Sequence, residues 1–393
     1  MTHRESAADL LSHLLRDDAS AWADAGQLAG EDLFNAALEH RVHLLLAWRL
    51  RQDSAAAVPC PVPTRQLFEE ALRAEAAIEQ LRRRELHCVL DALCVAGVEP
   101  LVFKGAALAF THYPDPALRP CLDTDLLVRG AEVPDAARAL ERLGYRAALS
   151  ITGELLNSPR PAEQVVRFKA SSQIAYARSD GFGLHHECDL HWQPSIPHVF
   201  TPVLPRDALD RDAVAVPELG PHARTFGAVH ALALACIHRV AHHHGTEHLL
   251  WLYDIHLIVE RLSPADADAF AHLAAGSRIS GVCLAGLAEA ARRFDTRVPE
   301  RCVARLRDDN ARDPAAPSAA YLRPRLRKVD VLRADLAALD RWRDQVALVR
   351  DHLFPPRSYI ERTYEVSTPA LLPLLYARRL FSGAWKWFRP RQE

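Results

Sequence analysis

Two aspartates, Asp123 and Asp125, interrupt the otherwise apolar segment LDTDLLV, and this pair constrains the fold more than any other feature of the chain. Side chains two residues apart on a β-strand point to the same face, so the two carboxylates are expected side by side. Adjacent carboxylates repel each other unless a cation neutralises them. The pair therefore predicts a strand that holds a divalent metal ion, with Mg²⁺ as the natural oxygen-liganded choice. A solvated strand end is the alternative interpretation of the pair by itself.

The segments around this pair supply further parts of a phosphate-binding site. An apolar run at 99–103 predicts a short strand, and Lys104 with Gly105 predicts the turn that opens a helix. Backbone N–H groups at the start of a helix favour phosphate groups. A third acid, Asp189, lies in the segment ECDLHW on a strand expected at 184–192. Three carboxylates on adjacent strands can hold two metal ions for phosphoryl chemistry.

The rest of the chain has mainly helical patterning. Short amphipathic helices are expected up to about residue 51, and the proline-containing stretch 58–64 predicts a linker. We expect one long helix from Thr64 to about residue 96, with Thr64 as its N-cap. Helical patterning returns at 225–294, and a single long helix is expected at 321–353. The two strands at 173–178 and 184–192 are joined by SDGFG, whose Asp-Gly predicts a hairpin.

Composition excludes several classes of protein. The 393 residues exceed one small domain, and 49% hydrophobic residues supply ample material for a core. Forty-eight Lys plus Arg against 50 Asp plus Glu exclude the strongly basic balance of a dedicated nucleic-acid binder. The eight cysteines include no C-x-x-C pair and are expected to be free thiols. The absence of a secretory signal pattern and of a long apolar run predicts a cytoplasmic protein without a membrane span.

The stretch at 101–128, LVFKGAALAFTHYPDPALRPCLDTDLLV, resembles the signature of a bacterial family of uncharacterised nucleotidyltransferases within the polymerase-beta-like superfamily. Relatives in that family show a KGxxL turn, a Tyr, an Arg-Pro and then D-x-D-L-L-V. The segment ECDLHW resembles the third-acid strand of the same family. WLYDIHLI at 251–258 resembles its helical half, and LFPPRSYIERTY at 353–364 resembles its C-terminal end. The likeness extends over most of the chain from about Leu67 onward.

The resemblance implies an α+β (mixed α/β) fold with a small nucleotidyltransferase sheet core between helical regions. The expected divisions are an N-terminal helical region at 1–60, the nucleotidyltransferase core at 61–200 and a C-terminal helical acceptor-side domain at 201–393. The implied site residues fall into three groups: Asp123, Asp125 and Asp189 as catalytic residues and metal ligands, with Asp189 also a candidate base; Lys104, Gly105 and Arg119 on the nucleotide phosphates; and His191, His238, His242 and Asp254 as acceptor or cleft residues.

The activity implied by the resemblance is transfer of a nucleoside monophosphate from a nucleoside triphosphate (NTP) to an acceptor hydroxyl or amine, with release of pyrophosphate. The expected cofactor is Mg²⁺ or Mn²⁺, with the NTP as donor substrate. A small molecule, a protein side chain and a tRNA end are all compatible acceptors, and DNA is not expected as a partner.

Two alternatives stay open. The wider superfamily often carries a hydroxyl residue after the glycine of the turn, whereas this chain has Gly105-Ala106-Ala107. That difference motivates the hypothesis of a catalytically degenerate nucleotide-binding or interaction protein. The second alternative is a His-metal hydrolase, because His238 and His242 are one helical turn apart. No H-E-x-x-H pattern accompanies them, so a His pair that is buried or lines the cleft is the simpler interpretation.

Overall fold

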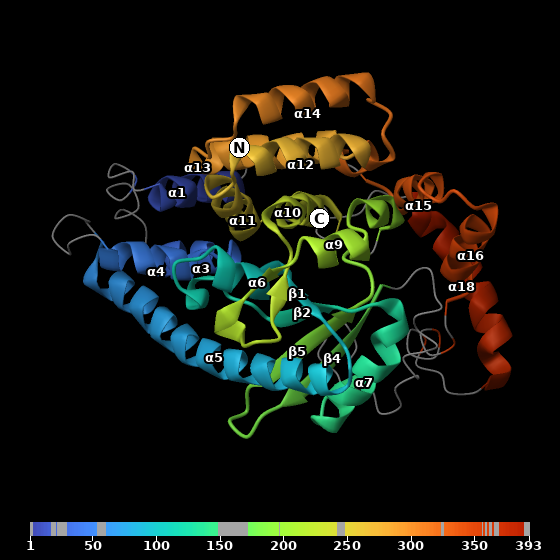
Figure 1. Ribbon diagram of the computed structural model, residues 1–393, viewed down its shortest axis with the longest axis horizontal. Helices are drawn as coiled ribbons and strands as arrows, with labels where there is room; N and C mark the ends of the chain where they lie inside the picture. The colour runs from blue at the N-terminus through green and yellow to red at the C-terminus, as the bar shows by residue number, and fades with distance from the viewer. Residues whose placement is uncertain are drawn as a thin grey trace.

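The computed structural model describes residues 3–16, 21, 30–52, 60–147, 172–195, 197–241, 248–323, 326–355, 357, 360, 364 and 369–388. Within them, a mixed sheet lies between two groups of helices (Figure 1). All eight cysteines are free thiols, as expected. Among these residues, none of the helices combines the length and the apolar character that crossing a bilayer requires.

The central sheet has five strands in the order β1-β2-β5-β4-β3. β2 and β5 run parallel, and every other neighbouring pair in this sheet is antiparallel. The parallel pair brings together two segments that lie more than 60 residues apart in the chain, and it carries the candidate site. The strands are β1 (Leu101–Phe103), β2 (Asp123–Leu127), β3 (Arg146–Ala147), β4 (Gln173–Ser179) and β5 (His185–His191).

The two faces of this sheet pack into two separate apolar cores. On β1, Leu101 and Phe103 belong to the larger core, whereas Val102 between them belongs to the smaller one. On β2, Leu127 belongs to the larger core and Leu126 to the smaller one. This alternation follows from the period of two along a strand. Positions on the face of the larger core are therefore the ones that can meet the helical half of the molecule.

The long helix α5 (Val62–Val95) connects the two cores. Its first half places Phe68 in the larger core, and its second half places Val89 and Leu93 in the smaller core. Helix α7 (Val133–Arg142) packs beside the second half and completes the smaller core. In Figure 1, α5 and α7 lie on the side of the sheet away from the helical half.

The larger core joins the N-terminal helices to the helices that follow the sheet. Helices α10 and α11 lie nearest to the sheet, and α12 and α14 lie beyond them (Figure 1). The helices before the sheet are α1 (His3–Leu15), α3 (Gly30–Glu39) and α4 (His43–Gln52), and α6 (Lys104–Thr111) lies within the core region. Those after the sheet are α9 (Arg206–Arg211), α10 (Ala228–Ala241), α11 (Leu249–Glu260), α12 (Pro264–Gly276), α13 (Ser280–Phe294), α14 (Glu300–Arg312), α15 (Lys328–Ala337), α16 (Trp342–Leu353) and α18 (Leu372–Phe388).

Short elements connect these parts. A two-stranded sheet of β6 (Val214–Ala215) and β7 (Arg224–Thr225) leads into α10. The 3₁₀ turns are η1 (Pro116–Leu118), η2 (Gly130–Glu132), η3 (His198–Val203), η4 (Pro217–Leu219), η5 (Pro317–Leu322) and η6 (Pro369–Leu371).

The α+β prediction is confirmed, with the sheet flanked by helices as expected. The strands expected around Lys104, the two aspartates and the Asp-Gly hairpin are present within two residues at each end. The divisions at 60/61 and 200/201 stay predictions.

The single helix expected at 321–353 is wrong, because the chain forms η5, α15 and α16 there. Gln345 explains the break between the last two helices. Its Nε2 donates to the carbonyls of Leu336 and Leu339, at 3.2 and 2.8 Å, where α15 ends. A side chain thus satisfies carbonyls that a continuous helix would have bonded itself.

Thr64 is not the N-cap of α5, since that helix begins at Val62. A proline in the first turn suits a helix start, because the N–H it lacks has no partner there. Thr64 is buried instead against Gly30 at the start of α3, where a Cβ on the glycine would lie 2.0 Å from Thr64 Oγ1.

Candidate functional site

The register of β2 against β5 aligns the acidic residues of the two strands. Asp125 lies directly opposite Asp189, and Asp123 lies opposite Glu187. Paired residues of neighbouring strands share a face of the sheet, so all four carboxylates lie on the face of the larger core, toward the helical half. The strand pairing thus brings together Asp123, Asp125 and Asp189, the three residues that the sequence proposed as one group.

Asp125 is the most enclosed of these carboxylates. Its Oδ1 is 2.7 Å from Lys104 Nζ and 2.7 Å from His191 Nε2. Burial alone would raise the pKa of Asp125, but the Lys104 ammonium and the His191 hydrogen bond hold that pKa well below its ordinary value. Burial, followed by the charge of Lys104, lowers the pKa of His191. Asp125 is therefore ionised at neutral pH beside a neutral imidazole that donates to it.

The other two aspartates have pKa values shifted in the opposite direction. Desolvation and then the charge of Asp125 raise the pKa of Asp123 to about 6, although this residue keeps access to solvent. Desolvation, Asp125 and Asp123 raise the pKa of Asp189 to about 7. Gln173 Nε2 donates to Asp189 Oδ2 at 2.5 Å and adds no charge. Among these three aspartates and Lys104, one cation faces three acids, and a further cation would stabilise the ionised group.

The donor atoms in this cluster fit a metal ion. Asp125, Asp189 and His191 each offer one ligand atom, and these atoms lie within 4.8 Å of one another. Within the described ranges, this is the one group of three or more His, Cys, Asp or Glu residues that meets this condition. Asp123 lies at the solvent-exposed start of β2, on the same face of the strand as Asp125. The residues present therefore fit a divalent cation between the two strands, with His191 closer to it than the sequence suggested.

Lys104 reaches Asp125 from a strained backbone position. It has a φ of 54°, in the left-handed region, at the point where β1 ends and α6 begins. Such a conformation costs a residue with a side chain about 1 kcal/mol or more. The conformation allows the chain to turn from strand to helix within one residue while the side chain stays beside the carboxylates. Strain of this kind is found where surrounding structure enforces it, often at functional sites.

Gly105 is required by a close approach of another segment. A Cβ at this position would lie 2.9 Å from Arg119 Nη1 and 3.0 Å from Cys121 Sγ. The glycine therefore lets the segment before β2 pack directly onto the first turn of α6. Ala106 and Ala107, the next two residues, are buried and offer no hydroxyl at this helix start.

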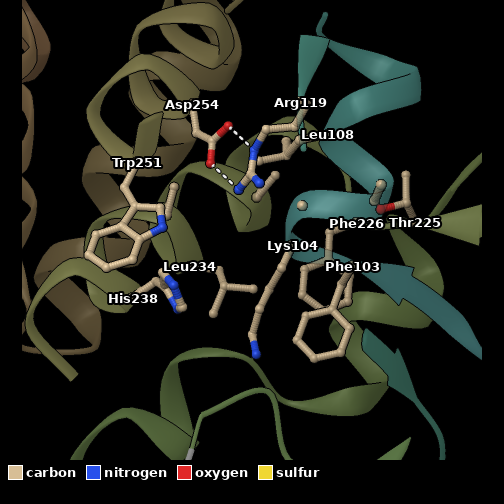
Figure 2. Close-up of a pocket in the computed structure, with 14 residues that line it drawn as sticks. Phe103, Lys104, Leu108, Arg119, Thr225, Phe226, Leu234, His238, Trp251 and Asp254 are labelled. Carbon is tan, nitrogen blue, oxygen red and sulfur yellow. Dashed lines mark hydrogen bonds and ion pairs between the residues drawn. The ribbon is translucent and has the colours of Figure 1, made fainter. Parts of the chain in front are cut away.

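Arg119 forms a buried ion pair with Asp254 of α11. Its Nε donates to Asp254 Oδ1 at 2.9 Å and its Nη2 to Oδ2 at 2.8 Å, as Figure 2 shows. Tyr113 donates its hydroxyl to the same Oδ1 at 2.7 Å. The sequence placed Arg119 at the nucleotide phosphates and Asp254 in the cleft, whereas the structure makes them hydrogen-bonded partners. The pair ties the segment before β2 to α11 in the helical half.

A pocket lies between α6, β7, α10 and α11. Figure 2 shows Trp251 and His238 on one side, Phe103 and Phe226 on the other, and Leu234 between them. Lys104 extends along this pocket toward Asp125, so the pocket and the carboxylate cluster are neighbours. The structure thereby gathers Lys104, Gly105, Arg119, His238 and Asp254 around one space.

Some of the histidines of the helical half lie outside the described residues. His238 lines the pocket, with its ring 5.3 Å from that of Trp251 at an interplanar angle of 88°. His242 lies outside the described residues, so the proposed pair of His238 and His242 is not tested. His256 is hydrogen-bonded to Thr296 through Nδ1 at 3.0 Å.

Sequence reasoning missed two residues beside the carboxylates. Gln173 comes from β4, and only its position opposite His191 in the strand register could have indicated it. Arg41 comes from the turn between α3 and α4 and also has a left-handed φ, of 58°. Burial and the charge of Arg119 lower the pKa of Arg41, whereas Asp123 raises it, which places this guanidinium within electrostatic reach of the cluster. No local pattern in the sequence connects Arg41 with Asp123.

Comparison with known proteins identifies one family. The family described as "Uncharacterised nucleotidyltransferase" matches residues 28–295, which include every strand of the central sheet and helices α10 and α11. None of the curated proteins matches the chain.

Proposed function

The chain belongs to the uncharacterised nucleotidyltransferase family, and from this premise we propose that it transfers a nucleoside monophosphate from an NTP to an acceptor hydroxyl or amine. The observation that carries the proposal is the parallel register of β2 and β5, which sets Asp125 against Asp189 beside Asp123 and Lys104. In the reaction, the acceptor oxygen or nitrogen bonds to the α-phosphorus, and the bond from that phosphorus to the bridging oxygen breaks. Pyrophosphate leaves, and the acceptor proton passes to a base.

Asp123, Asp125 and Asp189 are proposed to hold Mg²⁺ or Mn²⁺. When bound, divalent cations at such carboxylates lower the pKa of the attacking group and neutralise the triphosphate. Asp189 is also the proposed base, since it lies opposite Asp125 and is less enclosed. His191 donates to Asp125 and holds that carboxylate in place.

Lys104 and Gly105 are proposed to bind the triphosphate. The Lys104 ammonium already lies at the carboxylate cluster, and the first amides of α6 follow it directly. Arg119 is proposed to act by position rather than on the phosphates directly, because Asp254 engages both arms of its fork and the pair holds α11 beside Gly105. The acceptor, whether a small molecule, a protein side chain or a tRNA end, is not specified by these residues.

Calorimetric titration with ATP, GTP, CTP and UTP at millimolar Mg²⁺ tests the proposal. We expect metal-dependent binding of at least one nucleotide, weakened at least about tenfold in the Asp123→Ala, Asp125→Ala double variant, which removes the charges that hold the metal. Asp268→Ala, on the exposed face of α12, is the matched control and should bind like the unaltered protein. Retained binding in the folded double variant, or none in the folded unaltered protein, would contradict the proposal.

The buried Ala106 and Ala107 favour a second candidate, a degenerate member of the family that binds nucleotide without turnover. The two candidates differ in pyrophosphate release. A phosphate-detection assay with NTP, Mg²⁺ and pools of small-molecule, protein and tRNA acceptors separates them. Release that requires Asp123 supports the transferase.

A further inference from the structure

We infer that the pocket between α6, α10 and α11 binds the nucleobase of the donor nucleotide. This inference rests on the proposed function and deepens it, because it assigns one reactant to one side of the carboxylate cluster. It also identifies α10 and α11 as the elements that select the nucleotide.

The walls of the pocket suit a flat aromatic group. Phe226 stacks on Phe103, with ring centroids 5.3 Å apart and an interplanar angle of 19°. Trp251 lies across the pocket from this stack (Figure 2). Aromatic side chains offer faces and edges on which heterocyclic bases pack favourably. Leu234 lies between the two aromatic sides, so the walls are largely apolar and suit an uncharged aromatic group better than a sugar or a phosphate.

Helix α10 leaves room for such a group. Its pocket-lining residues, Ala231, Leu234, Ala235 and His238, follow the spacing i, i+3, i+4 and i+7 of one helical face. Two of the four residues are alanines, whose small side chains bring the helix backbone close to the pocket without filling it. The enclosed volume of the pocket is about 40 Å³, and the space counted with its open mouth is about 500 Å³. A base would therefore occupy the enclosed part together with the mouth.

The charges around the pocket decide which part of an NTP enters it. Arg119 and Asp254 neutralise each other through two hydrogen bonds, so this wall offers no net charge to a ligand. Lys104 is the cation of the pocket wall that faces the cluster, where its Nζ lies 2.7 Å from Asp125. An uncharged base therefore fits inside, and the triphosphate fits outside along Lys104. Thr225 and His238 supply polar groups in the wall for the edges of the base.

This placement leaves the other end of the cluster to the acceptor. Asp123 and Glu187 lie opposite each other at the exposed starts of β2 and β5. The acceptor would then approach from the solvent side, while the base is held between the sheet and the helical half.

Inorganic tripolyphosphate separates the base from the phosphates in a binding experiment. With Mg²⁺ present, we expect the best NTP to bind at least about tenfold more tightly than tripolyphosphate, because stacking of the base adds affinity. Ala235→Leu fills the pocket and should weaken NTP binding about tenfold while leaving tripolyphosphate binding unchanged. Ala231→Leu, one turn earlier, is a second filling variant. Ala265→Leu, on the exposed face of α12, is the matched control and should change neither affinity.

Each contrary result has a distinct meaning. Equal affinity for NTP and tripolyphosphate in the unaltered protein overturns the inference and leaves the transferase proposal intact. Unchanged NTP affinity in both folded filling variants also overturns it. Failure of the unaltered protein to bind either ligand contradicts both the inference and the proposed function.

Discussion

Lys104 with Asp125 and Arg119 with Asp254 are two enclosed ion pairs that border the same pocket. In the second pair, both oxygens of Asp254 accept from the Arg119 fork, and Tyr113 supplies a third donor. In the first pair, Lys104 and His191 both donate to Oδ1 of Asp125. Among the described residues, one pair is therefore closed by mutual hydrogen bonding, and the other keeps a carboxylate oxygen that accepts from neither Lys104 nor His191.

The surroundings of the two pairs differ in the same way. Burial lowers the pKa of Arg119, and the charge and hydrogen bonds of Asp254 more than offset it, so the pKa is raised. Asp125 instead shares its surroundings with Asp123 and Asp189, whose pKa values it raises. The closed pair is balanced in charge and joins two halves of the fold, whereas the open pair has excess negative charge. That excess is what a metal ion or a cationic substrate group can use.

The largest expected effect comes from breaking the closed pair. Asp254→Asn keeps the shape of the side chain but leaves the buried Arg119 without a counter-charge, which should lower the free energy of unfolding by about 3–5 kcal/mol. Urea denaturation at pH 7 measures the change. The double variant Arg119→Met, Asp254→Leu removes both charges and should recover most of the loss. If Asp254→Asn lowers the free energy of unfolding by less than about 1 kcal/mol, Arg119 and Asp254 do not depend on each other for charge neutralisation.

Asp335 of α15 extends the comparison to a buried acid that accepts hydrogen bonds from the backbone. Val199 N donates to its Oδ1 at 3.1 Å, and burial raises the pKa of Asp335 to about 7. The unfolded chain has a pKa near 4 for this group, so the folded state binds more protons between about pH 4 and pH 7. Stability should therefore fall as pH rises through this range, by up to about 4 kcal/mol.

Asp335→Asn tests this sign, because the variant removes the titrating group and should flatten that part of the pH profile. Urea denaturation at pH 5 and pH 8 gives the comparison with the unaltered protein. Parallel profiles for the two proteins would show that Asp335 is ionised in the folded state at both pH values.

The sheet and the aspartate pair could be predicted because their signals are local. The period of two in LDTDLLV and the Asp-Gly hairpin indicated the strands, and the Lys-Gly turn indicated the start of α6. The same period of two could have linked His191 to Asp189, since the two residues share a face of β5. From the sequence, His191 was expected only as an acceptor or cleft residue.

The partner of Arg119 could not be predicted in this way. Asp254 lies 135 residues further along the chain on a helix whose sequence is mostly apolar. The contacts of Arg41 and of Gln345 likewise depend on how distant or irregular segments pack, which no periodic pattern encodes. The positions of the candidate residues on the strands were therefore predictable, and the long-range contacts that decide which ion pairs are closed were not.

The smallest expected change in stability comes from the open pair, in the variant Asp125→Asn. This substitution removes the partner of Lys104, but Lys104 also interacts with Asp123 and Asp189 and is not left without counter-charge. The substitution removes the repulsion between Asp125 and the other two carboxylates, and the asparagine oxygen can still accept from His191. The free energy of unfolding without metal should therefore change by less than about 1 kcal/mol, or rise. A loss of 3 kcal/mol or more in urea denaturation, similar to that of Asp254→Asn, would mean that the Lys104 pair is as structural as the Arg119 pair.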